Sequence, residues 1–86
     1  MTMEEVIRQK LTKSLNPRIL DVVNESHLHA GHAGDDGSGE SHFRVKVVSS
    51  AFSGKTRVEA QRIIYEILQN EMKNGIHALS INALAD

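Results

Sequence analysis

Two threonine–glutamate pairs indicate where helices begin in this chain. Thr2 with Glu5, and Thr56 with Glu59, have the spacing of a capping box. In that motif a threonine hydroxyl and a glutamate carboxylate satisfy the first free amides of a helix. The sequence therefore predicts one helix at the N-terminus and another in the second half, with about 40 residues of other structure between them.

Apolar periodicity supports both helices. The first carries a stripe that repeats every four residues and ends before Pro17, because proline disfavours helix at the preceding residue. The second is predicted to run to about Met72, with Asn74-Gly75 as its stop signal. The stripe of the first helix is Met3, Ile7, Leu11 and Leu15, and the buried face of the second is Ala60, Ile63, Ile64, Ile67 and Leu68.

Three segments are typical of β-strands. Residues 18–25 are rich in isoleucine and valine. Residues 41–50 alternate strictly, which is typical of a half-buried strand. Residues 76–83 form the last apolar run. In the middle strand Phe43, Val45 and Val47 are predicted to face the core, and His42, Arg44 and Lys46 the solvent; in the last, His77, Leu79 and Ile81 share one face.

The order helix, strand, strand, helix, strand restricts the fold. A strand–helix–strand unit makes a right-handed crossover between two parallel strands, whereas the first two strands form an antiparallel pair. We therefore predict a two-layer α+β sandwich, with a three-stranded mixed sheet and the helices on one face. With 86 residues and no linker, the whole chain, 1–86, is predicted to be a single domain.

Composition excludes several classes of protein. The chain has no cysteine, so it cannot be a disulfide scaffold, use a thiol nucleophile or hold an iron–sulfur cluster by itself. No apolar run approaches the ~18 residues of a spanning helix, and no signal-peptide pattern is present, so we expect no membrane association and a cytoplasmic location. The net charge of −1 leaves only a local patch for nucleic acid.

Histidine is the main candidate for site chemistry. Residues 26–40 form a predicted long exposed loop with four glycines and three histidines, His27, His29 and His32. Neutral imidazole suits zinc, copper, nickel and iron, but a solvated polar loop is an equally simple interpretation. His77 opens the last strand beside a glycine turn. It is either a reachable ligand or a histidine at the core margin, satisfied by one hydrogen bond.

A basic strip is the second candidate. Arg44 and Lys46 on the wet strand face, with Lys55, Arg57 and Arg62, could contact phosphates. No stacking aromatic residue accompanies them, and a solvated surface explains them as well. The 53–56 segment is similar to the end of a phosphate-binding loop, but position 49 is serine where that loop needs glycine, which argues against nucleotide hydrolysis.

Four motifs together resemble the BolA family. They are residues 21–26 (DVVNES), 40–45 (ESHFRV), 49–55 (SSAFSGK) and 75–79 (GIHAL), and the resemblance extends from about Met3 to Ala83. It implies an αββαβ sandwich with a class II KH-like topology. This agrees with the fold predicted from periodicity.

The resemblance also implies a function. Proteins of this family act as non-enzymatic adapters for monothiol glutaredoxins in iron–sulfur and iron homeostasis. The implied metal ligands are His77 and His29, which lies three residues after the Glu-Ser pair; His27 and His32 are loop alternatives. A glutaredoxin cysteine and glutathione would complete a shared [2Fe–2S] cluster. The isolated chain is then expected to be a monomer without a cluster.

Two other functions are weighed against the adapter. Some members of the family are described as DNA-binding transcription regulators, which would use the KH-like fold and the basic strip. However, no G-x-x-G occurs at 51–57, where such a module would grip nucleic acid. A metal buffer using only the loop histidines is the third possibility.

Overall fold

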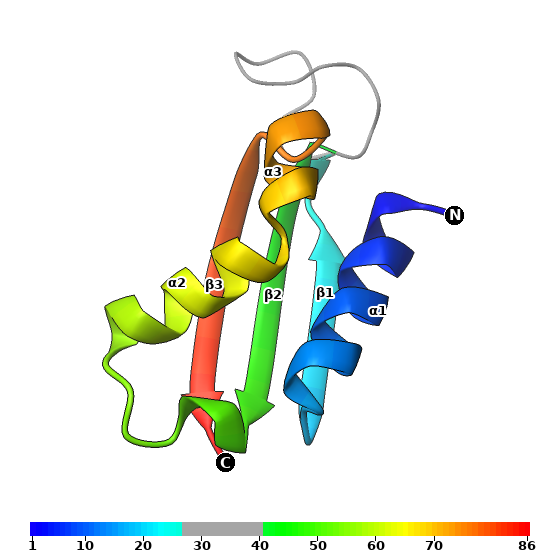
Figure 1. The fold of residues 1–86 in the computed structure, drawn as a ribbon. Coiled ribbons are helices and arrows are strands. Elements are labelled where there is room, and N and C mark those ends of the chain that lie inside the picture. The colour runs from blue at the N-terminus through cyan, green and yellow to red at the C-terminus, as the bar shows by residue number, and fades with distance from the viewer. Residues whose placement is uncertain (27–40) are drawn as a thin grey trace.

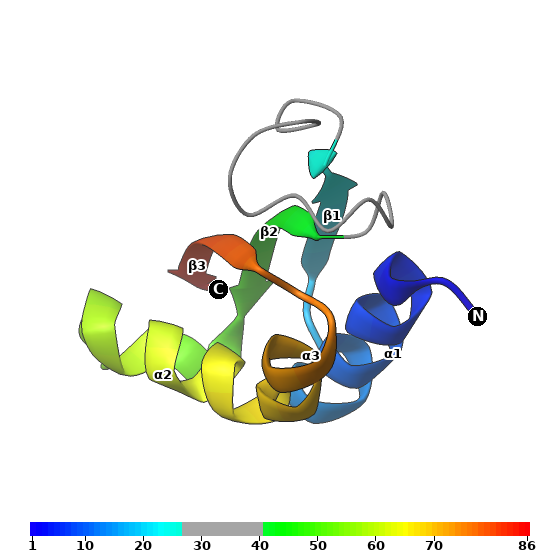
Figure 2. The same cartoon turned by 90° about the horizontal axis from the view of Figure 1, so that it is seen from above.

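The computed structural model describes residues 1–26 and 41–86, and Figure 1 shows their arrangement. A sheet forms one layer and the helices form the other, as the view from above in Figure 2 makes plain. The predicted α+β sandwich with a mixed sheet is confirmed. Its elements are α1 (Met3–Leu15), β1 (Ile19–Asn24), β2 (His42–Ser49), a 3-10 helix (Ser50–Phe52), α2 (Arg57–Ile67), α3 (Gln69–Asn74) and β3 (Ala78–Ala85).

The central strand of the sheet is β2. Strand β1 pairs with it antiparallel, with Ile19 opposite Val48 and Asn24 opposite Phe43. Strand β3 pairs with its other edge in parallel, and His42 stands opposite Ala78. The parallel pairing requires a crossover, which α2 and α3 supply.

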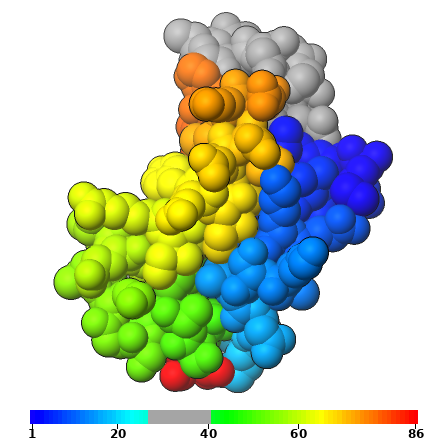
Figure 3. Space-filling model, viewed as in Figure 1, coloured from blue at the N-terminus to red at the C-terminus, as the bar shows by residue number. Residues whose placement is uncertain are grey.

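The core lies between the sheet and the helical layer. Figure 3 shows α1 and the α2–α3 segment side by side, and the same view in Figure 1 shows the sheet behind them. Burying apolar side chains here is the main stabilising contribution, at about 25 cal/mol per Å². The core residues are Ile7, Leu11, Leu15, Val22, Phe43, Val45, Val47, Phe52, Ala60, Ile64, Leu68 and Ile76.

Both capping boxes are present at the predicted helix starts. The Thr2 hydroxyl accepts from the amide of Glu5, and the Thr56 hydroxyl accepts from the amide of Glu59. Each glutamate carboxylate accepts in return from the threonine backbone, and these hydrogen bonds lower the pKa of both carboxyl groups. At the other end of α1, Asn16 takes a left-handed conformation (φ 44°) before Pro17.

The second predicted helix is broken at Leu68. Instead of one helix to Met72, α2 ends at Ile67 and α3 begins at Gln69, with Leu68 at φ −100° and ψ 18°. Leu68 is fully buried at the break, and the redirected α3 brings Glu71 to Lys10 of α1 (2.7 Å). The prediction of one continuous helix to Met72 was therefore wrong. The sequence did not reveal the break, because the apolar pattern continues through it.

The last strand starts two residues later than predicted. Strand β3 covers Ala78–Ala85 instead of 76–83, so His77 precedes it and is exposed. Leu79, Ile81 and Ala83 do share the inner face and pack against the core. None of the helices in residues 1–26 and 41–86 is both long and apolar enough to cross a membrane.

Candidate functional site

The candidate site lies at one end of the sheet, where β1 ends and both β2 and β3 begin, at the top of Figure 1. The mixed topology produces this convergence, because β2 runs antiparallel to β1 and parallel to β3. Ser26, Ser41, His42 and His77 meet here although up to 51 positions (77 − 26) separate them in sequence.

Ser26 ties the end of β1 to the start of β2. Its buried hydroxyl oxygen accepts hydrogen bonds from the backbone amides of Ser41 (2.9 Å) and His42 (3.1 Å). The amide of Glu25 also donates to the His42 carbonyl at 2.8 Å. Buried amides need partners, so these bonds fix the backbone at the point where β2 begins.

The backbone of His77 is anchored while its side chain is exposed. Its amide donates to the Ser41 carbonyl at 2.7 Å. On the preceding residue, the Ile76 side chain is buried and the amide donates to the Glu71 carbonyl at 2.8 Å. The backbone of His77 is therefore held in place by hydrogen bonds, while its imidazole side chain faces solvent. The hydrogen bond to Ser41 belongs to the backbone and not to the imidazole, and the exposed residue does not fill the core.

His42 lies against His77, which the sequence did not predict. The two ring centres are 5.6 Å apart with the planes tilted by 46°. His42 alternates with Phe43 as predicted and so shares a strand face with Arg44 and Lys46, but the expectation that it is solvated is wrong, because only 6% of the residue is exposed. Its Nδ1 is within hydrogen-bond distance of the Ser41 hydroxyl (2.8 Å). The sequence could have indicated this contact, because His42 and His77 each lie at the start of a strand and the two strands are parallel neighbours.

Of the four predicted metal ligands, only His77 belongs to the residues that the structure describes. His77 has the exposed position that a ligand needs. His27, His29 and His32 lie outside residues 1–26 and 41–86. Within those described residues no group of three or more histidine, cysteine, aspartate or glutamate side chains is arranged to hold a metal ion. Two adjacent imidazoles can hold part of a coordination sphere, with the remaining donors coming from elsewhere.

The five basic residues do not form one strip. Arg44 and Lys46 lie on the sheet face that the helices leave uncovered, beside a hollow of about 420 Å³, and Arg44 lies 3.5 Å from Glu25. Lys55 lies just before α2, Arg57 is the first residue of this helix and Arg62 lies in its middle, so all three belong to the helical layer. The sheet separates the two groups.

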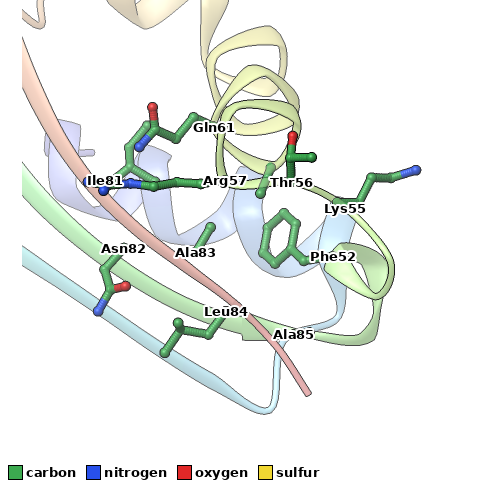
Figure 4. A pocket seen from close by; sticks show the side chains of 11 residues that line it. Phe52, Lys55, Thr56, Arg57, Gln61, Ile81, Asn82, Ala83, Leu84 and Ala85 are labelled. Carbon is green, nitrogen blue, oxygen red and sulfur yellow. The ribbon is translucent and has the colours of Figure 1, made fainter.

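Lys55 and Arg57 line a pocket of about 560 Å³ between the start of α2 and the last residues of β3, shown in Figure 4. Apolar side chains including Phe52 and Ala83 form much of its wall. Neither cation makes an ion pair within the described part of the chain. This pocket is a second, weaker candidate for binding an anionic group.

Known proteins resemble the chain over nearly its full length. It is 48% identical over 86 residues to the "Uncharacterized protein in cobS 5'region" of Sinorhizobium sp, covering 99% of this chain and 92% of that one. It is 37% identical over 82 residues to the "DNA-binding transcriptional regulator BolA" of Haemophilus influenzae, covering 95% and 76%. Other relatives are longer: the chain spans only 22% of SufE-like protein 1 of Arabidopsis thaliana, at 52% identity over 81 residues.

Solved structures agree with this relationship. The BolA domain of SufE1 from Arabidopsis thaliana superposes with a TM-score of 0.89 at 45% identity, covering 99% of this chain and 93% of that one. The model of the BolA-like protein family matches residues 11–86. By family model, sequence and fold, the chain belongs to the BolA-like family.

Proposed function

We propose that this chain is a non-enzymatic adapter that binds a monothiol glutaredoxin and shares a [2Fe–2S] cluster with it in iron–sulfur and iron homeostasis. The observation that supports this best is the position of His77, which is exposed while the hydrogen bond from its backbone amide to the Ser41 carbonyl holds its backbone. A ligand held in this way is preorganised, so little entropy is lost when a partner arrives.

The donor chemistry fits a shared cluster. The chain has no cysteine, and imidazoles alone do not complete a [2Fe–2S] centre. Two imidazoles can replace two thiolates on one iron, as in Rieske centres, if sulfur ligands hold the other. A glutaredoxin cysteine and its glutathione would provide that sulfur. Cluster sharing and heterodimer formation are then coupled, because the ligands of the shared cluster come from both chains.

His77 is the first ligand in this proposal and His29 the second. His27 and His32 are alternatives to His29 because they belong to the same segment, 26–40. We also propose that the isolated chain is a monomer without a cluster and that it works in the cytoplasm.

The test is cluster transfer from a glutaredoxin. The chain is mixed with a [2Fe–2S]-loaded monothiol glutaredoxin and followed by visible absorption and circular dichroism. We expect a new cluster spectrum in a heterodimer, which His77→Ala abolishes and the control Ser80→Ala, exposed in β3, preserves. A wild-type spectrum with His77→Ala would exclude His77 as a ligand, and no heterodimer with wild type would exclude the adapter function.

Nucleic-acid binding is the second candidate. Lys55 and Arg57 in the α2 pocket favour it, since neither makes an ion pair with another residue of 1–26 or 41–86, and so does the relative named as a DNA-binding transcriptional regulator. Phosphate contacts release counterions, so binding should weaken steeply between 50 and 200 mM salt. Lys55→Ala combined with Arg57→Ala should reduce that salt dependence, whereas Lys46→Ala should leave it unchanged. Salt-independent binding, or none, would exclude this function.

A further inference from the structure

We infer that the outer edge of β3 binds an extended acidic segment of a partner protein, which adds to the sheet as a fourth strand. The added strand lies in the pocket beside residues 81–85, near the end of β3, whereas His77 precedes the start of that strand. The inference is independent of the proposed function, because it involves neither His77 nor a cluster.

One side of the β3 backbone has no neighbouring strand in the described part of the chain, where the sheet order is β1-β2-β3. The amides of Ala78 and Asp86 donate to the carbonyls of Ser41 and Ser49, at 3.2 and 3.3 Å. In a regular strand, successive residues direct their backbone groups to opposite sides. The even-numbered residues of β3 therefore pair with β2, and the odd-numbered residues face the outer edge.

A hydrogen bond from α2 agrees with this assignment. The Tyr65 hydroxyl donates to the carbonyl of Leu79, an odd-numbered residue, at 3.4 Å. Beyond Leu79 the outward backbone groups have the spacing that a further strand needs for pairing. These edge groups are the amides and carbonyls of Ile81, Ala83 and Ala85.

The β3 edge lacks the usual protection against pairing. Proteins protect edge strands with charged residues, proline, bulges or a covering segment. The sequence of β3, ALSINALA, has no charge and no proline, and its register with β2 is continuous. The other edge strand is different: Asp21 places a charge in β1, and Arg8 of α1 donates to the Val22 carbonyl at 3.2 Å. The open edge is therefore that of β3.

The pocket beside β3 has room for an added strand. Figures 1 and 2 both show the start of α2 extending past β3 on the side away from β2. The pocket of about 560 Å³ lies between these two elements, and Phe52, Ala60 and Ala83 form part of its wall. Leu84 at its margin is 42% exposed. A strand paired with the edge groups directs alternate side chains into this pocket.

The charge at the pocket selects an acidic segment. Lys55 and Arg57 line it, and neither makes an ion pair with a residue in the described ranges. Figure 4 shows the Arg57 side chain lying along the pocket and Lys55 pointing outward. A carboxylate on the added strand can accept hydrogen bonds from the guanidinium, and such charge-assisted bonds are stronger than neutral ones.

Other occupants fit less well. In a second copy of the chain, β3 offers no carboxylate, and Asp86 after it is paired with Arg18. A single strand of nucleic acid needs aromatic rings on which its bases stack. Phe52, the aromatic residue of the pocket, is only 2% exposed. An acidic peptide segment uses both the edge groups and the cations.

The test is fluorescence anisotropy with a capped, fluorescein-labelled peptide, TVEVTV, which alternates β-formers around one glutamate. We expect saturable binding, at least tenfold weaker for TVKVTV. Two further peptides carry N-methyl groups on the amides of one edge or of the other, and only one of them should lose binding. Arg57→Ala should abolish the preference for glutamate over lysine, whereas the exposed Lys73→Ala should preserve it.

Hydrogen exchange of the wild-type chain tests the edge without any substitution. In the free chain the amides of the edge groups should exchange faster than those of Ser80 and Asn82, and TVEVTV should slow them. Absence of peptide binding, or equal binding of both N-methylated peptides, would overturn the inference. Protection by the oligonucleotide dT10 and not by peptide would assign the edge to nucleic acid, and protection that rises with chain concentration alone would assign it to a second copy; either result refutes the peptide site.

Discussion

The backbone amide of His77 donates to the carbonyl oxygen of Ser41 at 2.7 Å, so the contact that holds His77 in place does not use its side chain. Removing the imidazole ring should therefore leave the stability of the fold almost unchanged. We expect His77→Ala to change the free energy of unfolding by no more than about 0.5 kcal/mol, as for other exposed positions. Urea denaturation checks this, and a large loss of stability would show that the ring has a structural role.

Ser26 should be more important for stability than its size suggests. Ser26→Ala removes the acceptor for the buried amides of Ser41 and His42. Unsatisfied buried amides are costly, so we expect a loss of about 1–3 kcal/mol. Ser80→Ala, at an exposed position of β3, is the matched control and should unfold like wild type. Equal urea midpoints for the two variants would contradict the role of Ser26.

The two faces of α2 should respond differently to truncation. Ile64 is fully buried against the sheet and Arg62 is exposed on the same helix. Ile64→Ala should destabilise the chain by about 2–5 kcal/mol, because it removes a buried side chain and leaves a cavity. Arg62→Ala should have a much smaller effect. The comparison is made by urea denaturation, and similar losses in both variants would mean that the faces are wrongly assigned.

The loop histidines should be partly redundant in cluster binding. His29→Ala alone is expected to weaken the heterodimer spectrum less than His77→Ala, because His27 and His32 can replace His29 at some entropic cost. Changing all three to alanine should match His77→Ala. Visible circular dichroism of the four proteins decides this. If His29→Ala alone is as severe as the triple variant, the segment contains one dedicated ligand.

Acid should weaken the start of α2 through Glu59. Hydrogen bonds from the backbone and side chain of Thr56 lower the pKa of this carboxyl below its ordinary value of 4.5. A lowered pKa in the folded state means that its stabilising contribution is present above pH 4.5 and is lost as the pH falls through the folded pKa. Glu59→Gln keeps a capping side chain that does not titrate. Its stability should therefore fall less below pH 4.5 than that of wild type.

The control for this pH dependence is Glu66→Gln, at an exposed position of the same helix without a capping threonine. Urea midpoints at pH 7 and pH 3.5 should give the wild-type difference for this control and a smaller one for Glu59→Gln. Identical differences in all three proteins would show that the capping box does not contribute to acid sensitivity.

Local chemistry made much of this fold predictable. The capping boxes at Thr2 and Thr56 depend only on residues three positions apart in the sequence, so they could be recognised directly. The alternation of apolar and polar residues around Val45 indicates which face of β2 is buried. The break at Leu68 depends on packing across the core, and the sequence there continues the apolar pattern. The burial of His42 was missed for a related reason: alternation assigns a side chain to a face but does not show that one end of that face is covered.

The pairing pattern of β2 has a consequence for folding speed. The nearest bridge between β1 and β2 joins residues 19 positions apart, Asn24 and Phe43, and each bridge to β3 spans 36, as from His42 to Ala78. No part of the sheet can therefore form as a tight local hairpin. Loop-closure entropy must be overcome before any strand pair stabilises the chain, so we expect slower folding than for a helical bundle of equal length. The helices can form early, but they acquire a surface to pack on only when distant segments of the chain have met.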